Sequence, residues 1–142
     1  MATMQVELVA VERPIWSGPA TMVLARTTEG EIGILPGHEP TLAILEPGWV
    51  VRIKPEAGGE VRFAVHGGFL AVREGTVSIL AEAAEAAEEI NLASAREQLA
   101  EAERVLHANG EVDPEWRDLR DQALARIRTV DPSAGHVQTP SM

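Results

Sequence analysis

The stretch Val61–Ala81, VRFAVHGGFLAVREGTVSILA, alternates apolar and polar residues on both sides of a short turn at Glu74-Gly75. A period of two is typical of strands with one buried face, since successive side chains point to opposite sides. Glycine in the turn reaches the positive φ of a tight hairpin without steric cost. We therefore expect strands joined by hairpins, with a break at Gly67-Gly68.

Similar alternating runs precede this stretch, and Gly- and Pro-containing segments separate them. Several short strands divided by turn residues are typical of an all-β sandwich or barrel. The core must consist mainly of Val, Ile and Leu, because the chain has only two Phe and three Trp. The predicted strands are Gln5–Val11, Thr21–Thr27, Glu31–Leu35 and Trp49–Lys54, the last with Trp49, Val51 and Ile53 facing inward.

The residues after Glu82 are rich in Ala, Glu and Leu, and apolar residues recur there at helical spacing. Asn91 and Asp113 are suited to cap the starts of two helices, and Gly110 is suited to end the first. A short loop between two apolar stripes predicts an antiparallel hairpin with a narrow, Ala-rich seam. The stripes are Leu92, Ala95, Leu99, Ala102 and Leu106, followed by Trp116, Leu119, Ala123, Ile127 and Val130. We expect a β-sandwich domain over 1–86, the hairpin over 87–131 and a flexible tail over 132–142.

Composition excludes several classes of function. The 142 residues carry a net charge of −10, which makes nucleic acid a poor partner. The chain has no Cys and a single Lys, so thiol chemistry, Cys-ligated metals and a GxxxxGK phosphate loop are all excluded. No apolar run approaches the roughly 20 residues that span a bilayer, and no signal peptide is evident. We expect a cytosolic protein that contacts a membrane only through a complex.

The sequence offers no catalytic, cofactor-binding or metal site. The four His residues never pair at ligand spacing, and His66-Gly67-Gly68 has no GxSxG nucleophile to serve as an oxyanion loop. The acids of Glu82–Glu89 could form an acid/base pair, but charges near a helix N-terminus are ordinarily solvated. The residues alone thus predict a non-catalytic β-sandwich with a helical hairpin.

Two segments carry a more specific indication. Residues 29–40, EGEIGILPGHEP, are followed by LEPG at 45–48, and VHGGFLAV at 65–72 continues to VSILAEAA at 77–84. Together they closely resemble the epsilon subunit of F-type ATP synthase, over about residues 4–130. The resemblance implies a ten-stranded β-sandwich followed by a C-terminal antiparallel two-helix hairpin.

The resemblance also implies a role as a non-catalytic rotor subunit of the central stalk, without a cofactor. Such a subunit binds the gamma subunit and the c-ring and couples proton-driven rotation to ATP synthesis. The implied location is peripheral, on the cytoplasmic face of the cell membrane or the matching organelle membrane. Glu31, Pro36, Gly37 and His38 match the edge that faces these partners. Pro36-Gly37-His38 could also be a rigid chain reversal, and the two interpretations are compatible.

The resemblance bears on regulation as well. Some family members bind ATP through Ile/Leu-Asp-x-x-Arg-Ala, but residues 90–95 read INLASA, with Asn91 and Ser94 at the two charged positions. We assign no nucleotide site, because the arginine and its acidic companion are both missing. Inhibitory members extend the second helix toward the catalytic alpha and beta subunits, so Arg126 and Arg128 are candidates for a brake on hydrolysis. The alternative is that they merely complement the helix dipole.

Two further hypotheses belong to other classes of function. The chain could be a free-standing sandwich that binds a small ligand, in which case it would purify without partner subunits. It could also be an ATP sensor whose hairpin closes on nucleotide, which direct titration with ATP would reveal.

Overall fold

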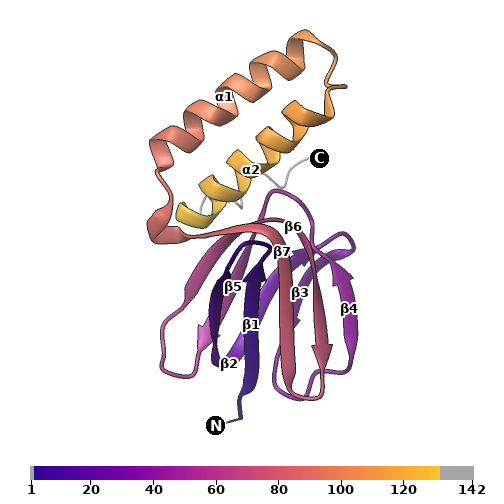
Figure 1. Ribbon diagram of the computed structural model, residues 1–142, viewed down its shortest axis with the longest axis vertical. Helices are drawn as coiled ribbons and strands as arrows, with labels where there is room; N and C mark the ends of the chain where they lie inside the picture. Colours follow the sequence, from indigo (N-terminus) through magenta and orange to yellow (C-terminus); the bar gives the residue numbers. More distant parts are fainter. Residues whose placement is uncertain (1, 132–142) are drawn as a thin grey trace.

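Seven strands form one sheet that closes on itself in the computed structural model, which describes residues 2–131 (Figure 1). The closed path runs β1-β7-β6-β5-β2 and returns to β1, while β3 extends it beside β2 and β4 pairs with β6. Only the β1–β7 pair is parallel among the named strands. The strands are β1 Met4–Ala10, β2 Pro14–Thr27, β3 Gly30–Ile34, β4 Thr41–Ile44, β5 Trp49–Pro55, β6 Val61–Arg73 and β7 Thr76–Ala86.

The strand count differs from the ten that the resemblance implied, and in the described residues that number is wrong. The difference arises because long strands change partners along their length. β2 pairs with β1 as far as Ala20, with β5 from Ala20 onward and with β3 from Val23 onward. β6 pairs with β5 in its first half and with β4 in its second half. The coarser expectation, a β-sandwich followed by a helical hairpin, is confirmed.

Gly67-Gly68 bends β6 instead of ending it. Both residues have positive φ, 72° and 121°, yet β6 stays paired with β7 on either side of them. The expected break was wrong because two glycines can adopt a strained backbone while the ladder continues. The prediction likewise started β2 too late, at Thr21 instead of Pro14, and missed the four-residue β4 altogether.

The apolar core lies inside the closed sheet. Alternate residues of every long strand point inward, and Val6, Leu8, Ile53, Leu70 and Ile79 are almost completely buried. Val51 and Ile53 face inward as predicted, whereas Trp49 is only half-buried at the start of β5. Every member of the core cluster comes from the first 86 residues, and no helix residue belongs to it. The sandwich therefore closes its core without the hairpin.

The hairpin consists of a short turn η1 (Ala87–Glu89), α1 (Leu92–Ala108) and α2 (Pro114–Val130). The predicted caps are confirmed: the Asn91 side chain accepts from the Ser94 N–H at 2.9 Å, and that of Asp113 accepts from the Glu115 N–H at 3.0 Å. Gly110 has a φ of 76° after α1, as expected. The expected tail, 132–142, lies outside the described residues.

Candidate partner-binding surfaces

Apolar side chains form a continuous row on the outside of the sandwich. Phe69 of β6 pairs with Ile44 of β4 on one side and with Leu80 of β7 on the other, and Leu80 pairs with Val9 of β1. Leu42, two residues before Ile44, lies on the same side of β4 and is 75% exposed. We call these five residues the apolar row; its other members are 36–61% exposed.

The row is separate from the core. Residues adjacent to the row in sequence point inward and are fully buried, as Leu8, Leu70 and Ile79 show. The row therefore occupies the opposite face of the same strands. A contiguous apolar patch on a protein surface, rimmed by polar groups, is typical of an interaction site. Sequence reasoning missed it because its members come from four strands spread along the chain, β1, β4, β6 and β7.

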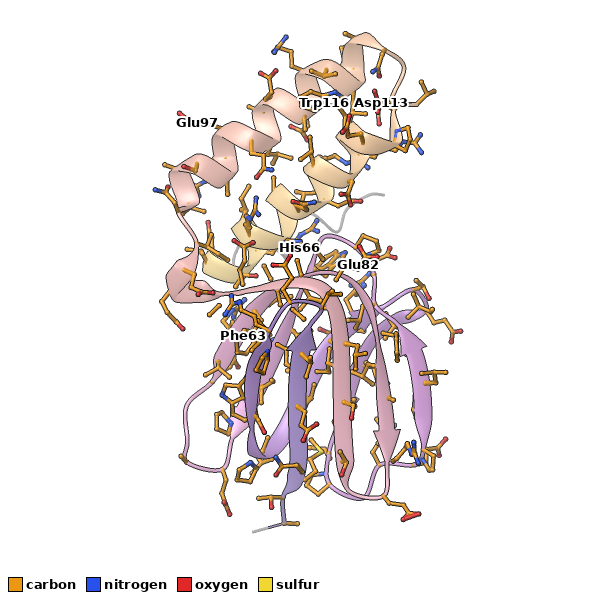
Figure 2. The ribbon with its side chains drawn as sticks, in the orientation of Figure 1. Phe63, His66, Glu82, Glu97, Asp113 and Trp116 are labelled. Atoms are coloured by element: carbon orange, nitrogen blue, oxygen red, sulfur yellow. The ribbon has the colours of Figure 1, made fainter. Side chains whose placement is uncertain are left out.

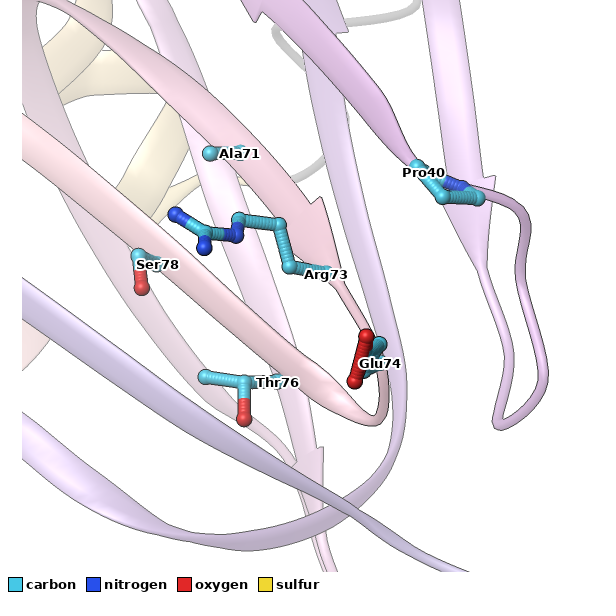
Figure 3. A pocket seen from close by; sticks show the side chains of 6 residues that line it. All are labelled: Pro40, Ala71, Arg73, Glu74, Thr76 and Ser78. Atoms are coloured by element: carbon cyan, nitrogen blue, oxygen red, sulfur yellow. The ribbon is translucent and has the colours of Figure 1, made fainter.

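A hollow of about 510 Å³ lies on the same face, toward the β6–β7 turn (Figure 3). Its walls are mixed, with small and polar side chains beside one cation and one anion. It supplies polar groups next to the apolar row, as the rim of a protein interface requires. The lining residues are Pro40, Ala71, Arg73, Glu74, Thr76 and Ser78.

The predicted contact residues lie at the two ends of β3. Glu31 is exposed near the start of β3, opposite Arg26 of β2, within the strand that was predicted for it. Pro36, Gly37 and His38 form a turn after β3, closed by the His38 N–H donating to the Leu35 carbonyl at 3.0 Å. Gly37 has a φ of 89° there, so the chain reversal is present. Contact of these four residues with partners stays a prediction.

Arg128 of α2 is buried against the sandwich. Its Nη1 donates to the Gly48 carbonyl at 2.6 Å, and its guanidinium lies 3.8 Å from the centre of the Trp49 ring. Arg26 stacks over the same ring at 4.6 Å. Burial, aided by the charge of Arg26, lowers the pKa of Arg128 to about 10, so it remains charged at neutral pH.

Arg126 of α2 also points toward the sandwich. Its Nε donates to Glu85 Oε1 at 2.7 Å, and its Nη1 donates to Gln98 Oε1 of α1 at 2.6 Å. The same Glu85 oxygen lies 3.0 Å from His66 Nε2. Burial alone would raise the pKa of Glu85, but hydrogen bonds from Arg126 and His66 outweigh it and lower that pKa.

Arg62 of β6 completes this contact by binding the end of α2. Its Nη2 donates to the Arg128 carbonyl at 3.0 Å, and its Nε donates to the Thr129 carbonyl at 3.1 Å. These carbonyls belong to the last turn of α2, where helical partners are missing. We call the whole contact the docking seam; it comprises Gly48, Trp49, Arg62, His66, Glu85, Arg126 and Arg128.

The docking seam changes how the two arginines are understood. The sequence indicated a contact with a catalytic subunit or an interaction with the helix dipole, whereas in the structure both arginines bind the sandwich. The sequence offered one signal for this contact: Ala125 and Thr129, small residues beside the predicted stripe, which are 0% and 1% exposed in the structure. Residues four apart lie on the same face of a helix, so these two residues mark a second face of α2 next to the predicted stripe. A role of Arg126 and Arg128 toward another subunit stays a prediction.

Other kinds of site find little support among residues 2–131. No three His, Asp or Glu side chains in that range are grouped to hold a metal ion. The side-chain Oδ1 of Asn91 already accepts the N-cap hydrogen bond from the Ser94 N–H of its own helix. Neither helix of the described chain has the length and apolar character needed to cross a membrane.

Residues 3–87 match the family model described as the ATP synthase, Delta/Epsilon chain, beta-sandwich domain. The ATP synthase epsilon chain of Rhodococcus opacus (strain B4) is 58% identical over 102 residues, 72% of this chain and 84% of that protein. The epsilon chain of Thermobifida fusca (strain YX) is 54% identical over 125 residues, 87% of this chain and 88% of that protein. The chain belongs to the ATP synthase epsilon chain family.

Solved structures agree with this membership. A chain in the Euglena gracilis mitochondrial ATP synthase structure of OSCP, F1 and c-ring has a TM-score of 0.75 at 29% identity. The match covers 94% of this epsilon-family chain and 82% of that chain. A chain of the Tetrahymena thermophila central stalk and c-ring structure, 15% identical with a TM-score of 0.53, shares the fold.

Proposed function

We propose that the chain is a rotor subunit of the central stalk of an F-type ATP synthase, bound to the gamma subunit and the c-ring. The apolar row carries this proposal, because a face that is not needed for the core stays apolar across four strands. Family membership and the c-ring assembly named for the Euglena relative support it. The implied position is peripheral, at the cytoplasmic face of the membrane.

The fold suits transmission of torque. A closed sheet resists shear, since its hydrogen bonds link each strand to two neighbours around the barrel. We assign the apolar row to gamma. We assign the two ends of β3, with Glu31 and the Pro36–His38 turn, to gamma and the ring.

Affinity purification tests this function. Tagged full-length chain, incubated with gently solubilised membranes at low salt, should recover gamma and the c-ring in constant proportion. The matched control carries Ile44→Asp in the apolar row and should recover much less of both. Equal recovery by the two baits, or recovery of the chain alone, would contradict the proposal.

A second proposal concerns the hairpin as a brake on ATP hydrolysis. The sandwich core is complete without the hairpin, and the docking seam consists largely of charged and polar contacts. The hairpin can therefore leave the sandwich as a unit, which would expose Arg126 and Arg128 to a catalytic subunit. In the docked state both arginines are occupied, so we place the inhibitory contact in the released state.

Two variants in the assembled complex separate the brake from simple release. Glu85→Gln weakens the docking seam and leaves both arginines intact, so it should lower ATP hydrolysis by releasing more hairpin. Arg126→Glu with Arg128→Glu also weakens docking but removes the inhibitory charges, so hydrolysis should rise at low salt. Added salt should shrink the second effect by screening. If both variants shift hydrolysis in the same direction, the arginines do not carry the brake.

A further inference from the structure

His66 lies in the docking seam, with one ring nitrogen bonded and the other unpaired. Figure 2 shows it at the end of the sandwich that faces the hairpin. The residue is 9% exposed, and its Nε2 lies 3.0 Å from Glu85 Oε1. The Nδ1 atom is buried and has no hydrogen-bond partner among residues 2–131. The proposed brake on hydrolysis assigns no role to this histidine.

This geometry suits the neutral imidazole. With the proton on Nε2, the ring donates to the Glu85 carboxylate, and Nδ1 keeps only an unused lone pair. A second proton would place a buried N–H at Nδ1 without an acceptor, which is costly. It would also add a positive charge next to Arg126, which shares the same carboxylate.

The charged groups around His66 act in opposite directions. Glu85 of β7 and Asp118 of α2 favour the charged ring, whereas burial and Arg126 of α2 disfavour it. Burial is the largest of these influences and lowers the pKa of His66 below its ordinary value of 6.5. That burial is partly supplied by the hairpin, because α2 packs on β6.

The hairpin is free to respond as a unit. The principal contacts of α1 are with α2, and it is α2 that reaches β5 and β6. The core cluster contains no helix residue, so release leaves the sandwich intact. We propose that His66 is a proton-sensitive latch, and that protonation of its imidazole releases the helical hairpin from the sandwich.

The direction with pH follows from linkage. A histidine whose pKa is lower in the docked state binds its proton more weakly there than in the released state. Docking is therefore strongest at a pH above the pKa of the released state and weakens as pH falls toward the lower pKa of the docked state. The ratio of docked to released chain falls by at most about tenfold per pH unit, the slope of one proton.

Thiol labelling of the full chain measures this ratio, because the chain has no Cys of its own. Thr129→Cys places one thiol in the last turn of α2, where the native side chain is 1% exposed. The same measurement on Glu97→Cys, at an exposed site of α1, corrects for the intrinsic pH dependence of the reagent. The corrected rate at position 129 should rise several-fold from pH 7.5 to pH 5.5.

Two histidine variants assign the effect. His66→Gln keeps a donor toward Glu85 but cannot titrate, so its corrected labelling rate should be flat over that range. His107→Gln removes an exposed histidine of α1 and should behave like the parent. The proposal would be overturned if the corrected labelling rate of the parent did not change with pH. It would also be overturned if the rate of the His66 variant rose as much as that of the parent.

A measurement without substitution guards against a variant that misfolds. In nuclear magnetic resonance titration of the unaltered chain, the His66 ring should titrate below the ordinary histidine pKa of 6.5. A midpoint for His66 at or above 6.5 would overturn the proposal. These measurements use the isolated chain, so their outcome does not depend on whether the released arginines inhibit hydrolysis.

Discussion

Gly68 lies closer to the neighbouring strand than a residue with a side chain could lie. A Cβ atom there would be 2.0 Å from the Leu80 carbonyl oxygen and 2.8 Å from the Ala81 Cα, both backbone atoms of β7. Its φ of 121° is also outside the range that other residues adopt readily. The bend of β6 therefore depends on a glycine at this position.

Gly68→Ala should lower the free energy of unfolding by about 3 kcal/mol, since it combines overpacking with backbone strain. Gly33→Ala is the matched control: its nearest neighbour is the Leu24 side chain at 3.4 Å, and its φ is not positive. It should change the free energy by less than about 1 kcal/mol. Urea unfolding followed by circular dichroism compares them, and equal losses would contradict the close approach described for Gly68.

At the residue scale, local contacts could be predicted and distant ones could not. Asn91 and Asp113 were recognised as caps because their partners lie two or three residues along the chain. Arg128 binds the Gly48 carbonyl 80 residues away, and Arg126 binds Glu85 41 residues away. No local pattern announces such pairs, so the docking seam could be found only from the folded chain.

At the scale of elements, periodicity located most strands and both helices. It indicated helices after the strands because composition changes at about Glu82, from Gly- and Pro-rich to Ala- and Glu-rich, although β7 continues to Ala86. It could not give the order of the strands, and the apolar row depends on that order. Leu80 meets Val9 and Phe69 only because β7 lies between β1 and β6.

Truncation after Ala87 tests the independence of the sandwich. The shortened chain should remain folded, because the entire core cluster is retained. It should show dispersed amide resonances and a cooperative urea transition, with a somewhat lower midpoint owing to the lost docking seam. Collapsed amide dispersion would show that the hairpin is needed for the fold.

At the scale of the whole molecule, the hairpin and the apolar row occupy different parts of the sandwich. The hairpin stands on one end, where α2 reaches β5 and β6 (Figure 1). The row crosses β4, β6, β7 and β1 on a side that the hairpin leaves open. A partner can therefore bind the row with the hairpin either docked or released.

The affinity of the full chain for purified gamma subunit tests the central claim most directly. Ile44→Asp with Leu80→Asp puts two charges into the apolar row and should weaken binding at least about tenfold, as expected for residues at the centre of an interface. Ala57→Asp with Val112→Asp adds the same charge at exposed sites outside the row and should leave the affinity within about twofold. With both variants folded by circular dichroism, equal affinities for gamma would contradict the assignment of the row.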